Sequence, residues 1–155
     1  MNKRLTVAIP TYNRSRTLAA TLLSVAAQKI PSGVAMECVV VDNNSTDDTA
    51  VVVERVAHDA PFAIRRVMEP RLGSSFARNR AVDEATGHYI LFIDDDALAE
   101  PDWANAMLAE IERRNLDAAC GAVLPRWSAM PPQWLGPSLY VRLAVHDESK
   151  LAGDA

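Results

Sequence analysis

The sequence predicts an α/β fold in which helices flank a mostly parallel sheet, and two features of the chain lead to this prediction. Short apolar runs alternate with segments in which apolar residues recur at helical spacing. One run, residues 89–93, continues without charge until it meets three consecutive carboxylates, Asp94, Asp95 and Asp96. Such an unbroken run is typical of a strand buried on both faces of a parallel sheet. Strands that alternate with helices favour right-handed crossovers around that sheet.

The first half of the chain holds two of the expected strands, each followed by a helix. Residues 5–9 form the first strand, and Ser15 is placed to cap the next helix. Residues 36–41 form the second strand. Ser45 and Asp48 have the spacing of a capping box for a second helix, which reaches about residue 58.

The second half continues the same alternation. Arg65 and Arg66 interrupt the third strand, and charge of this kind is tolerated at the edge of a sheet. Pro101 fits the first turn of the last long helix. The expected elements are a strand at 64–68, a helix at 76–85, the central strand at 89–93, a helix from 101 to 115, a fifth strand at 118–124 and a short helix at 139–145.

Composition narrows the function classes. The chain has 155 residues, enough for a sizeable core, and its net charge of −4 argues against sequence-independent nucleic-acid binding. Its apolar runs are too short to cross a bilayer, and its first residues lead into a strand and not a signal peptide. We therefore expect a cytoplasmic protein, with association to the inner face of the membrane as an alternative. Cys38 and Cys120 fall within expected strands and are interpreted as buried core thiols.

The loops exclude several nucleotide-binding and hydrolytic sites. The turn after the first strand holds Pro10, Thr11, Tyr12 and Asn13, without the glycines of a dinucleotide-binding turn. The sequence also lacks the P-loop pattern and the Gly-x-Ser-x-Gly elbow of α/β hydrolases. The three histidines are scattered and form no cluster along the chain.

Three acids at the end of a strand indicate a cation site. Asp94, Asp95 and Asp96 repel one another, and hard carboxylate oxygens suit Mg²⁺ or Mn²⁺. The carboxyl ends of strands are also where open α/β sheets bind ligands. The first hypothesis is therefore a metal-assisted phosphate or diphosphate site.

Two further residues follow strand ends that open onto the same edge. Asp42 closes the second strand, and a carboxylate can accept the imide N–H of a pyrimidine base. Tyr12 follows the first strand, and its ring can stack on the face of a base.

Arginines are concentrated between the third strand and the following helix. Their guanidinium groups can pair bidentately with phosphate oxygens. We expect Arg78 to serve a diphosphate, with Arg71 as second choice. The five are Arg65, Arg66, Arg71, Arg78 and Arg80.

At this point the sequence resembles the inverting family 2 glycosyltransferases of the GT-A fold. Four blocks carry the resemblance, in the right order and spacing: residues 7–14, residues 39–49, Gly73 with residues 77–79, and residues 92–96. Residues 121–127 and 131–135 also look like segments of some bacterial members. The resemblance implies a Rossmann-like sheet that forms the nucleotide-binding half of the GT-A fold. It also implies an enzyme that transfers a sugar from a nucleotide-diphosphate donor with Mg²⁺ or Mn²⁺.

The resemblance assigns roles to the residues already singled out. Asp42 would hydrogen-bond the base and Tyr12 would stack on it, with Pro10 and Thr11 framing the pocket. Asp94, Asp95 and Arg78 would serve the donor side. Asp96, together with Asp94, would hold the metal that bridges the two phosphates.

The chain departs from the family pattern after the fifth expected strand. Members usually continue into an acceptor-binding half with a carboxylate general base, and no motif of this sequence matches that base. Asp147, Glu148 and Asp154 stand in a solvated context. We therefore expect a nucleotide-sugar-binding domain at 1–125 and a Trp- and Pro-rich extension at 126–155, the start of a missing acceptor region.

Three functional hypotheses follow. The first is a glycosyltransferase that uses a nucleotide-diphosphate sugar, of which UDP-sugars are the family's commonest, and a saccharide, lipid or protein acceptor. The second is a non-catalytic or truncated nucleotide-sugar-binding module, completed by a homodimer or a partner subunit. The third is a metal-dependent phosphohydrolase, which would be indifferent to Tyr12 and Asp42. None of the three uses nucleic acid as a partner.

Overall fold

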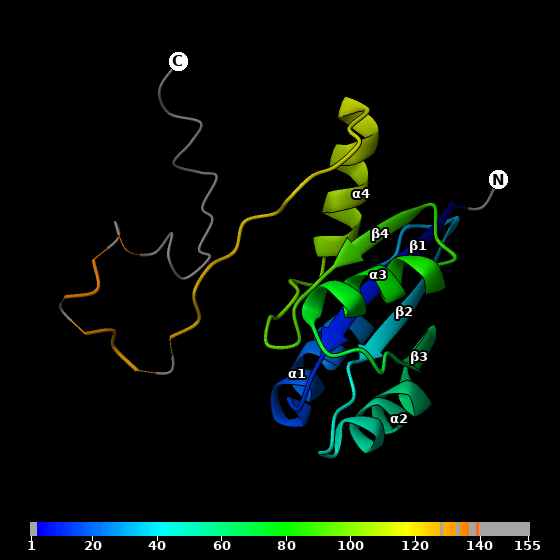
Figure 1. Ribbon diagram of the computed structural model, residues 1–155. Coiled ribbons are helices and arrows are strands. Elements are labelled where there is room, and N and C mark those ends of the chain that lie inside the picture. The colour runs from blue at the N-terminus through cyan, green and yellow to red at the C-terminus, as the bar shows by residue number, and fades with distance from the viewer. Residues whose placement is uncertain (1–2, 128, 133, 137–138, 140–155) are drawn as a thin grey trace. The chain divides into compact units, whose positions relative to one another are not determined.

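The computed structural model describes residues 3–127, 129–132, 134–136 and 139, and the chain divides into two units, residues 1–109 and 110–155 (Figure 1). The first unit holds the whole sheet. In chain order the elements are β1 (Lys3–Thr11), α1 (Ser15–Ala26), β2 (Val34–Asp42), α2 (Thr49–Asp59), β3 (Ala63–Met68), α3 (Ser74–Glu84), β4 (Tyr89–Phe92) and α4 (Trp103–Arg114).

The four strands form one parallel sheet in the order β3-β2-β1-β4. This confirms the expected α/β fold and the placement of the arginine-bearing strand at an edge. The register aligns the last residues of β1 and β2, Thr11 with Asp42. All strands therefore present their carboxyl ends, and the loops that follow them, along one rim of the sheet.

Helices cover both faces of the sheet. Leu18 of α1 and Val53 of α2 join the larger apolar cluster, which includes Val7 and Cys38 of the strands. On the opposite face, Ala77 and Ala81 of α3 pack with Ala8, Val39 and Val41. Figure 1 shows α3 in front of the strands. Side chains that alternate along β1 and β2 thus enter two separate apolar layers.

The connections create a switch point beside β1. From β1 the chain steps outward through α1, β2 and α2 to β3, and α3 then returns across the other face to β4, which pairs with β1. The helix that follows β1, α1, and the helix that precedes β4, α3, therefore lie on opposite faces of the sheet. Open α/β sheets bind ligands in the crevice at such a point.

The strand expected at the centre of the sheet was placed wrongly. Among the described strands, β4 pairs only with β1, and Phe92 is 41% exposed. Its apolar run suggested burial on both faces, but Tyr89 and Ile90 are only partly buried. Apolar composition alone does not distinguish an edge strand from a central one.

The fifth expected strand is also wrong. Residues 118–124 contain only an isolated bridge at Val123, and most of their side chains are exposed. Small residues such as Ala118 and Gly121 offer little apolar area to bury, so the segment lacks the driving force for a sheet strand. Cys38 is buried as expected, whereas Cys120 is exposed, contrary to expectation.

Two helix starts differ from the expected caps. Arg14, not Ser15, is the N-cap of α1, and the N-cap of α2 is Asp48, without a side-chain capping bond. Asp47 instead binds a backbone N–H at the start of α2: its Oδ1 accepts the Thr49 N–H at 3.1 Å. The short helix expected at 139–145 lies, apart from Leu139, outside the described residues. Among the described helices, none is long and apolar enough to cross a membrane.

Candidate functional site

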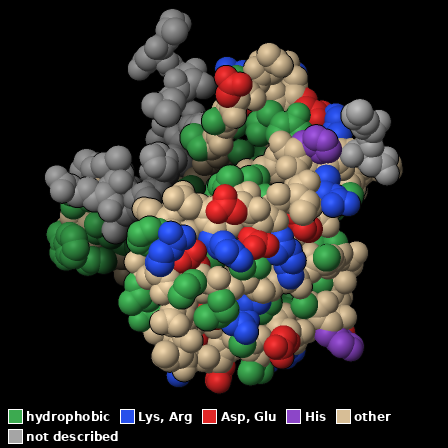
Figure 2. All heavy atoms as spheres, turned by 45° about the vertical axis from the view of Figure 1, so that its right-hand side comes forward, with side chains coloured by type: hydrophobic (Ala, Val, Ile, Leu, Met, Phe, Trp, Pro, Cys, Tyr) green, Lys and Arg blue, Asp and Glu red, His purple; other side chains and the backbone are tan. Residues whose placement is uncertain are grey.

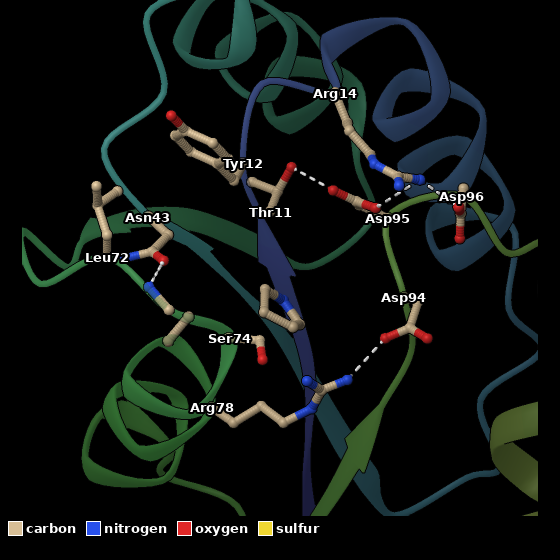
Figure 3. Close-up of a pocket in the computed structure, with 13 residues that line it drawn as sticks. Thr11, Tyr12, Arg14, Asn43, Leu72, Ser74, Arg78, Asp94, Asp95 and Asp96 are labelled. Atoms are coloured by element: carbon tan, nitrogen blue, oxygen red, sulfur yellow. Dashed lines mark hydrogen bonds and ion pairs between the residues drawn. The ribbon is translucent and has the colours of Figure 1, made fainter.

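A pocket of about 460 Å³ opens at the rim of the sheet, between the loops that follow β1 and β4 (Figure 3). It therefore occupies the switch point that the topology creates. Its lining residues come from the end of β1, from four loops and from the start of α3: Pro10, Thr11, Tyr12, Arg14, Asn43, Leu72, Gly73, Ser74, Ala77, Arg78, Asp94, Asp95 and Asp96.

Tyr12 stands at the pocket on a turn that is tied to the loop after β2. Asn13, next to it, has a φ of 53°, a left-handed conformation that asparagine tolerates. Its N–H donates to Ser45 Oγ at 2.9 Å, and its Oδ1 accepts the Thr46 N–H at 2.7 Å. The Tyr12 ring is half exposed, so it offers an open aromatic face.

Asp95 is buried and linked to the end of β1. The Thr11 hydroxyl donates to its Oδ2 at 2.7 Å, and burial raises the pKa of this carboxyl above its usual value. Asp95 lines the pocket, and its expected contact with the donor stays a prediction. Its bond with Thr11 joins the loop after β4 to the end of β1.

Asp94 and Asp96, on either side, are accessible and each meets an arginine. The Arg78 guanidinium lies 2.9 Å from Asp94 Oδ1, and Arg14 pairs with Asp96 (Figure 3). The side chain of Asp94 is 67% exposed and that of Asp96 is 49% exposed. Two carboxylates and two guanidinium groups thus form a compact set of charges on one side of the pocket.

The donor chemistry of this set fits a divalent cation supplied jointly with a phosphate ligand. Within the described part of the chain, no three His, Cys, Asp or Glu side chains are grouped to hold a metal on their own. Mg²⁺ usually binds through one or two carboxylates together with substrate phosphates, not in an all-protein cage. Asp94 and Asp96 provide that number of accessible hard oxygen ligands.

Asp42 does not line the pocket. It is 2% exposed, its Oδ1 accepts the Ser45 N–H at 2.8 Å, and its Oδ2 pairs with Arg66 at 2.9 Å. The next residue, Asn43, lies at the pocket in its place. Alternation along the strand end explains the difference, since neighbouring residues point to opposite sides.

The arginine-rich segment is neutralised by acids of the same unit. Figure 2 shows Lys and Arg side chains interleaved with Asp and Glu on one face. Only Arg78 of the five arginines lines the pocket. The pairs are Arg65 with Glu84 and Glu37, Arg66 with Asp42, Arg71 with Glu69, Arg78 with Asp94, and Arg80 with Glu84.

Arg14 is the cation that the residue-by-residue sequence reasoning missed. It lies in the loop after β1 and contacts both Asp96 and, at 3.9 Å, Asp95. Its place at the end of the first matching block, residues 7–14, was the available signal. The acids to which it pairs lie more than 80 residues away, so spacing could not reveal the contact.

The start of α3 forms the floor between the two sides. Gly73 is its N-cap with a φ of 134°, a conformation open to glycine, and Ser74, Ala77 and Arg78 follow at the pocket. Free backbone N–H groups and the helix dipole favour an anion at such an end. Figure 3 places Tyr12, Leu72 and Asn43 on one side and the three acids on the other.

Comparison with known proteins gives a consistent result. The sequence model described as "Glycosyl transferase family 2" matches residues 6–140. The succinoglycan biosynthesis protein ExoM of Rhizobium meliloti is 31% identical over 129 residues, which are 83% of this chain and 41% of that relative. The uncharacterized glycosyltransferase YibD of Escherichia coli is 29% identical and covers 92% of this chain and 46% of its own.

Solved structures share the fold. S. aureus TarS 1–349 in complex with UDP superposes with a TM-score of 0.65 at 26% identity, over 79% of this chain and 38% of that one. The mannosyltransferase PcManGT from Pyrobaculum calidifontis, in complex with GDP-Man and Mn²⁺, gives 0.62 at 35% identity, over 79% and 35%. The chain therefore spans less than half the length of the relatives and structures named here.

Proposed function

Since the chain belongs to glycosyl transferase family 2, we propose that its pocket binds the nucleoside diphosphate part of a nucleotide-sugar donor for glycosyl transfer. One observation carries the proposal: the pocket joins an open aromatic face at Tyr12 to a pair of accessible carboxylates, Asp94 and Asp96. A nucleotide presents the same two chemistries, a flat base and a charged diphosphate. The start of α3 lies between them, where the phosphates would pass.

Binding of the diphosphate and the cation would change the partners of the charged side chains in the pocket. Asp94 and Asp96 would hold Mg²⁺ or Mn²⁺, which when bound supplies Lewis-acid stabilisation to a departing diphosphate. Arg14 pairs with Asp96, and Arg78 pairs with Asp94. Released from them, the two guanidinium groups would be free to donate to phosphate oxygens at the same wall. Binding of the diphosphate and of the cation would therefore support each other.

Uridine nucleotides are the first donors to test. Crystal structures of S. aureus TarS 1–349 contain UDP or UDP-GlcNAc, whereas the structure of PcManGT is a complex with GDP-Man and Mn²⁺. Both superpose on this chain above 25% identity. These proteins support a nucleoside diphosphate as the ligand class and leave the base to be determined.

The proposal is tested by calorimetric titration of UDP with and without Mn²⁺. We expect UDP binding that requires Mn²⁺ in the wild type and is weakened at least about tenfold in Asp96→Asn, because one metal ligand is lost. Asp83→Asn, at an exposed position of α3, removes the same charge outside the pocket and is the matched control. Equal UDP affinity in Asp96→Asn and the wild type would contradict the role of Asp96.

A second function, a nucleotide-sugar-binding module without turnover, is favoured by one observation. The carboxylates that line the pocket within the described residues are Asp94, Asp95 and Asp96, and Asp95 is buried against Thr11. With the other two assigned to the metal, no pocket carboxylate remains to serve as general base. Incubation with UDP-sugars and Mn²⁺, followed by assay of released UDP, separates the two: release supports an enzyme, and binding without release supports the module.

A further inference from the structure

A buried glutamine just after α1 joins that helix to the segment that follows the three acids. Gln28 is 7% exposed and does not line the pocket. Its Nε2 donates to the carbonyl oxygens of Glu100 at 2.7 Å and Ser24 at 3.1 Å, and its Oε1 accepts the Ala104 N–H at 2.9 Å. Both amide hydrogens are used in this way. The side chain therefore connects the end of α1 to the start of α4.

Two further hydrogen bonds extend this connection along the same segment. The Ala99 N–H donates to Ser24 Oγ at 3.0 Å, and the Lys29 N–H donates to the Pro101 carbonyl oxygen at 2.9 Å. The last turn of α1 and the residues directly after it therefore hold the backbone of residues 99–104 at several successive positions.

The segment held in this way begins at the turn that carries the acids. The Ala97 N–H donates to the Asp94 carbonyl oxygen at 3.1 Å, and this bond closes a turn around Asp95 and Asp96. Ala99 follows that turn by only two residues. α1 therefore fixes the chain almost directly beyond the acids.

Both ends of α1 thus contact the chain that carries the acids, but through groups of different kinds. At its start, Arg14 pairs with Asp96 (Figure 3), and the Arg14 side chain is 52% exposed. The proposed function assigns this carboxylate to the cation, so the pair with Arg14 would be lost on binding. At the other end, the buried Gln28 side chain binds only backbone groups. A cation at Asp96 leaves these bonds unchanged.

We propose that Gln28 and Ser24 are positioning residues of the cation site. They fix the segment beyond Asp96 against α1, so that this carboxylate keeps its place at the pocket once Arg14 leaves it. The inference rests on the proposed function, which assigns Asp96 to the cation. Part of the support for the site then lies at the far end of a helix whose 12 residues span about 18 Å.

Two variants remove these bonds, and two controls match them. Gln28→Met keeps the length of the side chain but leaves its backbone partners without the amide. Ser24→Ala removes the hydroxyl that accepts a backbone N–H. Ser32→Ala makes the same change at an exposed position of the connection between α1 and β2. Val56→Ala removes buried apolar volume from α2, so it lowers stability at a different helix.

Mn²⁺ binding at saturating UDP is measured by electron paramagnetic resonance, and urea denaturation gives the stability of each variant. Loss of a direct hydrogen-bond partner of a metal ligand costs about tenfold or more in metal affinity. Since Gln28 acts through the backbone, we expect Gln28→Met to weaken Mn²⁺ binding about fivefold and Ser24→Ala about threefold. UDP affinity at saturating Mn²⁺ should stay within about twofold of the wild type, and both controls should match the wild type for Mn²⁺.

Two further readouts test how these residues act. Gln28→Met should weaken Mn²⁺ binding no further in the Asp96→Asn background, which is a non-additive result. Hydrogen exchange of the ligand-free protein reports the bonds themselves. The Ala104 amide should exchange about tenfold faster in Gln28→Met, and the Ala99 amide about tenfold faster in Ser24→Ala.

Several outcomes would overturn the inference. One is an unchanged Mn²⁺ affinity in Ser24→Ala, a small substitution that gives the answer even where Gln28→Met does not fold. Another is an equal loss of Mn²⁺ affinity in Val56→Ala, which would show a general effect of lowered stability. Additive losses in the double variant would show that Gln28 does not act through Asp96. In all three cases the wild type still binds UDP with Mn²⁺, whereas a wild type that does not bind UDP contradicts the proposed function itself.

Discussion

Glu69 and Asp95 are both buried acids, yet their surroundings move their pKa values in opposite directions. Hydrogen bonds from the Arg71 side chain and backbone lower the pKa of Glu69 to about 2. Burial raises the pKa of Asp95, and the Thr11 hydroxyl only partly opposes this. The folded protein thus favours the charged form of Glu69. It disfavours the charged form of Asp95, and other contacts between β1 and the loop after β4 must offset this free-energy cost.

The lowered pKa of Glu69 predicts how the stability of the protein depends on pH. Its pKa in the folded protein, about 2, lies below its ordinary value of 4.5, so its contribution is present above pH 4.5 and is lost as the pH falls toward 2. We expect Glu69→Gln to lower the free energy of unfolding most at neutral pH, with the difference from the wild type shrinking between pH 4.5 and 2. Urea unfolding at several pH values measures this. Glu54→Gln, exposed on α2, is the control, and a difference that grows in acid would contradict the assignment.

The hydroxyl of Thr11 is expected to stabilise the fold through Asp95. Thr11→Val keeps the shape of the side chain and removes the hydroxyl that donates to the buried Asp95 carboxylate at 2.7 Å. We predict a loss of about 1–3 kcal/mol in the free energy of unfolding at neutral pH. Thr17→Val, at an exposed position of α1, should lose much less. If chemical denaturation shows that the two variants lose the same free energy of unfolding, the bond between Thr11 and Asp95 does not stabilise the fold more than an exposed hydroxyl does.

At the residue scale, sequence reasoning located the side chains that directly follow strands. Tyr12, Asp94 and Asp96 line the pocket because the ends of parallel strands share one rim. Asp42 ends its strand at the same rim as expected, but its side chain is buried and Asn43 lines the pocket in its place. Asn43 and Arg14 could not be assigned, because their partners lie 26 to 82 residues away.

At the scale of elements, the strands and helices with regular apolar spacing were predicted correctly. The errors concern features that depend on tertiary packing: the position of a strand in the sheet, the existence of the fifth strand and the residues that begin two helices. β4 has the composition of a central strand but pairs only with β1 in the described sheet. Residues 118–124 begin with small residues, and their two large apolar side chains, Val123 and Leu124, are exposed. Both helix starts differ because Ser15 and Ser45 use their polar groups to tie neighbouring loops, not to cap a helix.

The turn into β4 requires glycine for a reason of close approach. A Cβ at Gly87 would lie 2.6 Å from the Thr6 backbone nitrogen and 2.8 Å from the Tyr89 carbonyl oxygen. We predict that Gly87→Ala costs about 1–3 kcal/mol of unfolding free energy, since the backbone must shift to relieve the contact. Gly136→Ala, where no atom lies within 4 Å, is the control. Equal urea midpoints for Gly87→Ala and the wild type would contradict this packing.

At the scale of the whole molecule, function follows from topology. The return of α3 across the opposite face places the loops after β1 and β4 on either side of one crevice, with a helix start between them. This arrangement could be predicted from the alternation of elements and the acids at a strand end. The acceptor and the general base could not, since the chain spans 41% of ExoM and 38% of TarS 1–349.

Thermal unfolding with UDP, GDP or TDP, each with and without Mn²⁺, tests the central claim most directly. A ligand that binds only the folded state at 100 times its Kd stabilises it by about 2.7 kcal/mol, which raises Tm by several degrees. We predict that at least one nucleoside diphosphate raises Tm with Mn²⁺, by more than Mn²⁺ or the nucleotide does alone. An unchanged Tm for all three nucleotides in saturating Mn²⁺ would contradict a donor site at this rim.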